Sequence, residues 1–354
     1  MKNMFYIMVM ALSFLDGHAQ KPFSNVDQWL ESHVDDMGGR LLLMVYKDGK
    51  IVYSHAVNKM GPRHKALVKV VARKQGMQAD LSDYTLTTRQ PVASCSKWLS
   101  AALVMTFVDE GKLKLTDTVG SFLPVLTKNG KGAITVTDCL SHLTGIVSPD
   151  LKANLQDMKQ ASSMEEAIEK IAHYPVEDRP GQVFRYSNIG LQIAGAIIEK
   201  ISGKNFETLF KERIAEPLEM KSTDFGKRKV ALPAGGAVSS PSDYMNFLVM
   251  IQNSGVFNGK RILSEQSITQ MQINRINSDV KIAYTPAEAG GLGYGFGEWV
   301  QDSAAVSSPG LFGSFPWVDN DTGYCAFLMA FYIKSDDRQE KYAELRALVN
   351  EALR

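Results

Sequence analysis

The chain has 354 residues, of which 45% are hydrophobic and 22% are charged. This is enough for a large buried core and roughly two domains' worth of chain, and the charged share excludes wholesale disorder. The formal net charge is +1, so the overall balance gives no indication of nucleic acid or an acidic membrane as a partner.

The first residues have the pattern of an export signal. Lys2 precedes an apolar stretch over residues 4–15, and the small residues Gly17 and Ala19 lie near a plausible cleavage point. This order is typical of a cleaved signal peptide, and the stretch is shorter than the ~18 residues that a membrane-spanning helix needs. We therefore expect residues 1–19 to be removed near Ala19, which predicts a secreted or periplasmic protein with no stable membrane span in its mature chain. A buried N-terminal helix is the alternative.

Two apolar runs, over residues 41–46 and 51–53, flank Asp48-Gly49. This arrangement predicts a β-hairpin. A basic run from Lys59 to Lys74 follows it. We interpret the run as the solvated face of a surface insertion, because one short run without a basic overall balance is a weak signal for nucleic-acid binding.

The middle of the chain is predicted to be helical. Residues 94–110 are apolar nearly all round, which indicates a buried helix. Ser163 with Glu166 forms a capping-box pattern, and Ser240 before a proline is a second N-cap signal. Further helices are predicted from Ser163 toward residue 173, over residues 188–201 and over residues 244–253.

Strands return near residue 290. Glycine alternates with larger residues over 292–300, and further strands are predicted over 313–318 and 324–333, with a turn between them, before a helix over 337–354. The prediction is an α+β fold. One antiparallel sheet is built from both chain ends and flanked by helices, with an inserted helical subdomain. We expect a single domain over residues 20–354, with an α/β part over 20–93 and 290–354 and a helical part over 94–289.

Metal and cofactor motifs are missing from the sequence. Cys95, Cys139 and Cys325 form no C-x-x-C pair and are interpreted as small buried residues. The sequence has no H-E-x-x-H, no P-loop and no G-x-S-x-G. We expect no metal site and no cofactor.

Ser94 and Lys97 stand three residues apart at the start of the predicted buried helix. Residues at i and i+3 share one helix face, so the lysine amine can reach the serine hydroxyl. Burial would lower the pKa of the lysine and let it accept a proton. Tyr186 and Asn188 form a second candidate pair, just before another apolar helix. The phenol could move protons, and the amide could donate to a substrate carbonyl. Taken in isolation, each pair favours a structural interpretation over a catalytic one.

The two pairs together resemble a known family. The chain resembles the serine β-lactamase and penicillin-binding protein superfamily, in the branch of class C β-lactamases and family VIII esterases, from about Leu41 onward. The resemblance rests on the order and spacing of five pieces, at residues 91–97, 111–117, 142–145, 180–188 and 235–239. It implies the β-lactamase-like fold and an acyl-enzyme mechanism. Ser94 would be the nucleophile, and Lys97 and Tyr186 would handle its proton, with either of them as the acylation base.

The resemblance also implies an oxyanion hole, made by the N–H groups of Ser94 and Leu311. The third family motif, on the sheet edge, usually carries a lysine or histidine that helps hold a substrate carboxylate. The matching segment here is Ser308-Pro309-Gly310, with Ser308 and Gly310 expected to contact substrate. A neutral hydroxyl replaces the cation, which favours an esterase or peptidase over a β-lactamase.

The leading hypothesis is an exported serine hydrolase acting on esters or small amides. A D-alanyl or peptidoglycan-type peptidase and a weak β-lactamase are the alternatives within the family. The expected partner is a small ester, amide or peptidoglycan-fragment substrate. A non-catalytic binding or scaffold protein that keeps the fold is the alternative of another class. His142, Gln182 and Arg185 are interpreted as structural.

Overall fold

The computed structural model describes residues 21–75, 78–301, 305–334 and 337–354. The signal peptide predicted over residues 1–19 lies outside the described residues. Among the described residues, no helix has the length and apolar character needed to cross a membrane.

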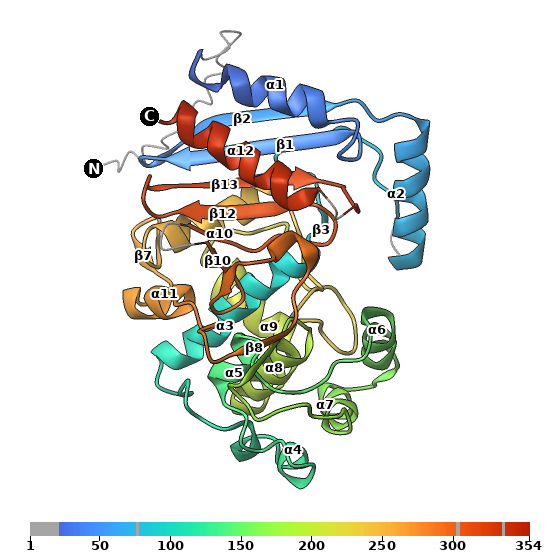
Figure 1. Ribbon diagram of the computed structural model, residues 1–354, viewed down its shortest axis with the longest axis vertical. Helices are drawn as coiled ribbons and strands as arrows, with labels where there is room; N and C mark the ends of the chain where they lie inside the picture. Colours follow the sequence, from blue (N-terminus) through green and yellow to red (C-terminus); the bar gives the residue numbers. More distant parts are fainter. Residues whose placement is uncertain (1–20, 76–77, 302–304, 335–336) are drawn as a thin grey trace, which may run out of the picture.

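A seven-stranded antiparallel sheet forms one half of the molecule (Figure 1). Its order is β2-β1-β13-β12-β11-β10-β9, and Leu43 of β1 lies opposite Leu328 of β13. The sheet is therefore built from both ends of the described chain, as predicted. Its strands are β1 (Arg40–Lys47), β2 (Lys50–Asn58), β9 (Gly293–Tyr294), β10 (Trp299–Gln301), β11 (Ala305–Ser307), β12 (Phe315–Asp319) and β13 (Tyr324–Ala330).

Helices α1 (Ser24–His33) and α12 (Arg338–Ala352) lie across one face of this sheet (Figure 1). Successive side chains of a strand point to opposite faces. Leu41 and Leu43 accordingly join the core under α1 and α12, whereas Leu42 and Met44 join the larger core on the other face. The sheet thus separates two hydrophobic cores.

The basic run forms α2 (Pro62–Gln75), which projects beside the sheet (Figure 1). Arg63, Lys65 and Lys69 are exposed on it, in agreement with the predicted solvated face.

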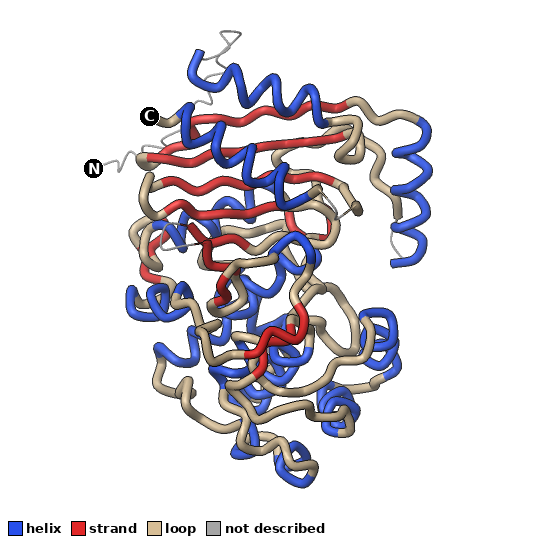
Figure 2. Tube along the Cα trace, in the orientation of Figure 1, coloured by secondary structure: helices blue, strands red, loops and turns tan. Residues whose placement is uncertain are grey.

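The other half of the molecule is helical (Figure 2). Buried residues fill nearly the whole of α3, as its apolar sequence predicts. The helices here are α3 (Ser96–Asp109), α4 (Pro124–Lys128), α5 (Val136–Leu140), α6 (Leu151–Gln160), α7 (Met164–Ala172), α8 (Ile189–Ser202), α9 (Phe206–Phe210), α10 (Pro241–Gln252) and α11 (Glu265–Gln272). Three short strand pairs complete it: β3 (Gln90–Pro91) with β5 (Val238–Ser239), β4 (Val183–Arg185) with β8 (Lys281–Tyr284), and β6 (Val256–Phe257) with β7 (Lys260–Arg261).

The predicted helix caps form at α7 and α10. The Ser163 hydroxyl accepts a hydrogen bond from the Glu166 N–H, although the Glu166 carboxylate bonds to Ser162 and not to Ser163. The Ser240 hydroxyl caps α10. Helix α10 begins at Pro241, earlier than the predicted start, because proline is well suited to the first helical position.

The single strand predicted over residues 292–300 is wrong. The segment forms a tight hairpin, in which β9 and β10 are joined by a turn and the Gly295 N–H donates to the Glu298 carbonyl. Gly297 has φ +77°, a conformation that side chains disfavour, so the alternating glycines allow a turn rather than mark a continuous strand.

Candidate active site

Ser94 lies in a short 3-10 turn, Ala93–Cys95, between β3 and α3. Ala93 has φ +47°, which is a strained left-handed conformation for a residue other than glycine. Ser94 lines a cavity of about 2250 Å³, while its neighbours Cys95 and Ser96 are buried in the protein. The strained turn therefore presents Ser94 to the cavity, while Cys95 and Ser96 face the protein interior.

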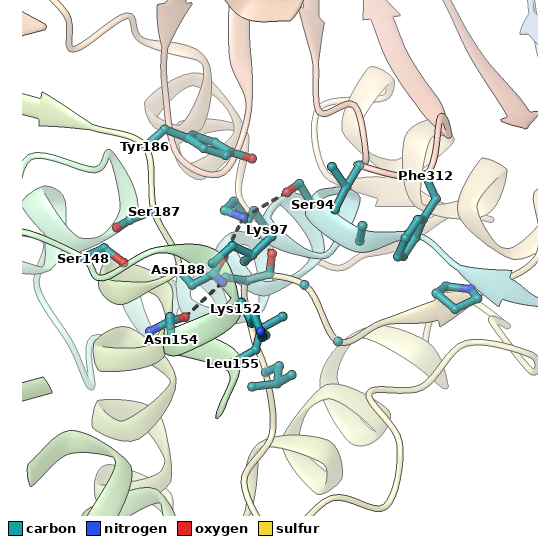
Figure 3. Close-up of a pocket in the computed structure, with 18 of the residues that line it drawn as sticks. Ser94, Lys97, Ser148, Lys152, Asn154, Leu155, Tyr186, Ser187, Asn188 and Phe312 are labelled. Atoms are coloured by element: carbon teal, nitrogen blue, oxygen red, sulfur yellow. Dashed lines mark hydrogen bonds between the residues drawn. The ribbon is translucent and has the colours of Figure 1, made fainter. Parts of the chain in front are cut away.

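Lys97 follows one helical turn later. Its Nζ lies 3.2 Å from Ser94 Oγ, 3.3 Å from Asn188 Oδ1 and 2.8 Å from the Ala234 carbonyl oxygen (Figure 3). The side chain is buried, and within the described residues no carboxylate pairs with it. Burial lowers the pKa of Lys97 to about 7. A large fraction of the amine is therefore uncharged in neutral solution and able to take a proton from Ser94.

Tyr186 lies next to Lys97 and faces Ser94 (Figure 3). Its hydroxyl points toward Ser94 (Figure 3). Its ring centroid lies 4.7 Å from Lys97 Nζ and 5.1 Å from the stacked ring of Trp299. Burial raises the pKa of Tyr186, so the phenol keeps its proton in neutral solution. The predicted trio of Ser94, Lys97 and Tyr186 is therefore together in the structure.

Asn188 joins this group through its side-chain amide. Its Oδ1 accepts from Lys97, and its Nδ2 donates to Asn154 Oδ1 of α6 at 3.2 Å. The amide thus orients the lysine, and it ties α6 to the centre of the site. One amide hydrogen of Asn188 remains for another acceptor.

The two backbone groups expected to form an oxyanion hole are those of Ser94 and Leu311. Both residues line the cavity, and no acceptor among the described residues takes either N–H. A Cβ on Gly310 would lie 2.2 Å from the Val92 carbonyl oxygen, so only glycine lets this loop approach the strand before Ser94. Gly310 therefore holds the neighbouring Leu311 at the cavity.

A family model described as Beta-lactamase matches residues 26–351. The chain belongs to the Beta-lactamase family. Members of this family are serine hydrolases, and the fold predicted from the sequence is confirmed.

Solved structures and curated relatives agree with this assignment. A penicillin-binding protein homologue from Pyrococcus abyssi, octameric in its structure, has a TM-score of 0.71 at 23% identity, covering 92% of this chain and 78% of that one. EstCE1, a hydrolase with promiscuous acyltransferase activity, has a TM-score of 0.74 at 17% identity, covering 93% and 98%. An N-acetylmuramyl-L-alanine amidase of Bacillus subtilis is 25% identical over 213 residues, 57% of this chain and 46% of the amidase.

Ser308 stands at the third motif of the Beta-lactamase family, where the resemblance implies a contact with substrate. The side chain is 3% exposed, and its hydroxyl donates to the Gly297 carbonyl at 2.9 Å. It does not line the cavity. The Ser308 hydroxyl ties the end of β11 to the β9–β10 hairpin, and it also lies 3.4 Å from the Ser94 carbonyl oxygen. Its contact with a substrate stays a prediction.

The three residues interpreted as structural lie outside the proton-handling trio. Arg185 forms two hydrogen bonds with the Glu177 carboxylate, at 2.6 and 2.8 Å. His142 is buried against Tyr186, and its Nε2 lies 3.0 Å from the Tyr294 hydroxyl. Burial lowers the pKa of His142, so the ring is neutral. The Gln182 carbonyl accepts from the Lys281 N–H in the β4–β8 pair.

The cysteines are free and buried, as interpreted from the sequence. Within the described ranges, no cluster of histidine, cysteine and acidic side chains could hold a metal ion.

Three contributors to the site were missed. The Ala234 carbonyl accepts from Lys97, Asn154 holds Asn188, and Trp299 stacks on Tyr186. Of the three, only Ala234 could have been found from the sequence, because it directly precedes residues 235–239, which carry part of the family resemblance.

Glu298, beside Trp299, is fully buried, and neither carboxylate oxygen has a hydrogen-bond partner among the described residues. Burial raises the pKa of Glu298 well above its usual 4.5. The folded state therefore keeps a proton that the unfolded chain releases above about pH 4.5. We expect Glu298→Gln to become increasingly stabilising, by up to about 1.4 kcal/mol per pH unit, as the pH rises above 5.

Urea unfolding of wild type and variant at pH 5 and pH 8 measures this difference. Glu265→Gln, on the exposed surface of α11, is the control and should show no such trend. Equal pH dependence in wild type and Glu298→Gln would contradict the assignment.

Proposed function

We propose that this protein is an exported serine hydrolase that forms an acyl-enzyme on Ser94 and acts on esters or small amides. The observation that carries the proposal is the buried Lys97 amine, 3.2 Å from Ser94 Oγ and without an acidic partner among the described residues. The pattern of residues 1–19 supports export.

The proposed reaction begins when Ser94 Oγ attacks the substrate carbonyl carbon. Its proton passes to Lys97, because the lysine with a pKa of about 7 is a better acceptor than the protonated phenol of Tyr186. The Ser94 and Leu311 N–H groups stabilise the oxyanion. Tyr186 hands a proton to the leaving group and receives one from Lys97. Water then attacks the acyl carbon and gives a proton to Lys97, and the bond to Ser94 Oγ breaks as that oxygen takes the proton from Lys97.

Esters are favoured over β-lactams because of the sheet edge. A charge-assisted hydrogen bond to a substrate carboxylate is worth about 1.5–3 kcal/mol, and the segment from Ser308 to Gly310 has no cation to make one. A second candidate function is cleavage of peptidoglycan fragments. The likeness to the Bacillus subtilis amidase and the expected export support that candidate.

The proposed function is tested with a fluorophosphonate probe, which labels activated serines. Wild type should be labelled, and Ser94→Ala should lose the label entirely. Ser148→Ala and Ser187→Ala are matched controls, because both serines line the same cavity (Figure 3) and should leave labelling intact. Absence of labelling in a folded wild-type protein would instead favour the non-catalytic scaffold.

A substrate panel separates the enzyme candidates. Short p-nitrophenyl esters should be turned over at least ~10-fold faster than a chromogenic cephalosporin, because the missing cation lowers only the binding of the latter. Faster release of D-alanine from a D-Ala-D-Ala peptide than of nitrophenol from the esters would favour the peptidase.

A further inference from the structure

The outer wall of the cavity carries four cations. Lys152 and Lys159 come from α6, and Lys227 and Arg228 come from the segment that follows Phe225. All four side chains are exposed at the cavity, and none has an acidic or carbonyl partner among the described residues. Positive charge therefore gathers on this wall without an acceptor from the protein.

The acidic groups of the same cavity are already engaged. Asp224 pairs with Arg89 at 2.5 Å, and Glu288 pairs with the buried Arg338 at 3.1 Å. The Asp150 carboxylate caps the start of α6. The four cations are thus not neutralised by the carboxylates that line the cavity beside them, which leaves the wall positive toward a ligand.

Apolar side chains lie next to these cations. Leu151 and Leu155 of α6 are 50% and 40% exposed, and both line the cavity. Residues at i and i+4 share one helix face, so the two leucines and Lys159 form one strip along α6, with Lys152 beside it. In Figure 3, Lys152 and Leu155 lie next to each other, near Asn188. Across the cavity, Leu311 and Ile333 are also exposed, at 41% and 37%.

Exposed leucines and isoleucines that line a reaction cavity bind apolar chains, because contact with such a chain removes their surface from water. Unpaired lysine and arginine side chains bind carboxylate or phosphate. Helix α6 offers both surfaces within one turn of each other. A ligand that covers both must itself be amphipathic.

We propose that the natural substrate is an amphipathic ester or amide, whose apolar chain contacts Leu151 and Leu155 and whose anionic group binds the cations of the outer wall. This inference rests on the proposed serine hydrolase function and adds the substrate class. The anion site lies on the helical wall of the cavity, whereas the cation expected from the family resemblance would have been on the sheet edge.

Matched ester pairs test the proposal. On the acyl side, 4-nitrophenyl hexanoate is compared with mono-4-nitrophenyl adipate, which has the same chain length and a terminal carboxylate. On the leaving-group side, phenyl hexanoate is compared with 4-carboxyphenyl hexanoate. We expect the carboxylated member of one pair to have a kcat/KM about 10-fold higher at low salt, with the preference falling toward unity in 0.5 M NaCl as the charges are screened.

Charge reversal assigns the preference to the wall. The double variant Lys152→Glu with Lys227→Glu should reverse the ratio of kcat/KM between the two esters of the preferred pair. Lys229→Glu is the matched control, since Lys229 is exposed in the same segment but does not line the cavity, and it should keep the wild-type ratio.

The possible failures are distinguishable. Turnover of the neutral esters without a carboxylate preference in either pair would overturn this inference and leave the serine hydrolase standing. A preference that survives the double variant would overturn the assignment to the outer wall. If no ester is hydrolysed and the fluorophosphonate does not react, the proposed function falls, and this inference falls with it.

Discussion

Hydrolysis of a neutral ester should rise with pH, with a midpoint near pH 7, and Lys97→Met should remove both the rise and most of the rate. Burial lowers the pKa of Lys97 to about 7, and only the uncharged amine can take the Ser94 proton. Below the midpoint kcat/KM should fall ~10-fold per pH unit, because this constant reports the ionisation of the free enzyme. Loss of the general base should cost ~10²–10⁴ in rate.

Lys97→Arg tests whether Lys97 acts by accepting a proton or only by its positive charge. Lys97→Arg should be as inactive as Lys97→Met at every pH, because a guanidinium cannot release its proton. Lys131→Met is the control. Lys131 is also a buried lysine that donates to a backbone carbonyl, but it lies outside the cavity, so its loss should not move the midpoint. A wild-type profile that is flat from pH 5 to pH 9 would contradict Lys97 as the base.

Gly297→Ala should destabilise the fold strongly and lower the activity as well. Gly297 has φ +77°, and a Cβ there would lie 2.4 Å from the Lys97 carbonyl oxygen and 2.9 Å from Ala101 Cβ. The left-handed conformation costs about 1–2 kcal/mol and the overlap about 1–3 kcal/mol, so we expect about 2–5 kcal/mol in all. The backbone at Lys97 must move to make room, which displaces the amine from Ser94.

Urea unfolding and ester turnover measure the two effects of Gly297→Ala. Gly323→Ala isolates the conformational cost, because Gly323 has φ +70° in the β12–β13 turn and no atom within 4 Å of an added Cβ. The control should lose about 1–2 kcal/mol and keep its activity. Equal losses of stability in the two variants would show that the contact with α3 is unimportant.

Helices bounded by a cap or stop residue could be predicted from the sequence alone. Helix α8 ends at Gly203, which takes the left-handed conformation that such a stop requires, and α10 follows its serine cap. The strands β10 and β11 have three residues each, too few to show a period of two. The glycine alternation over residues 292–300 predicts one strand, whereas the structure has a hairpin of β9 and β10 there. Their pairing depends on register with β12, which no local pattern encodes.

In the candidate site, too, some contacts follow from the sequence and others depend on tertiary packing. The contact between Ser94 and Lys97 follows from helical spacing alone. Spacing gives no reason for Tyr186 to reach them, and that expectation came from the family resemblance. The burial of the Ser308 side chain and the contact between Asn154 and Asn188 depend on tertiary packing. Neither can be predicted from the residue types.

The pairing of β1 with β13 has a consequence for synthesis. The ribosome makes β1 and the Ser94 turn early, but the strand that completes their sheet emerges only after the whole helical half. Until then the edge of β1 has no partner, and Leu42 and Met44 lack the core formed with Phe327 and Met329. Unpaired edges of this kind invite association with other chains, and contacts so distant in sequence form slowly. A nascent chain that stalls before β13 is therefore a natural client for chaperones.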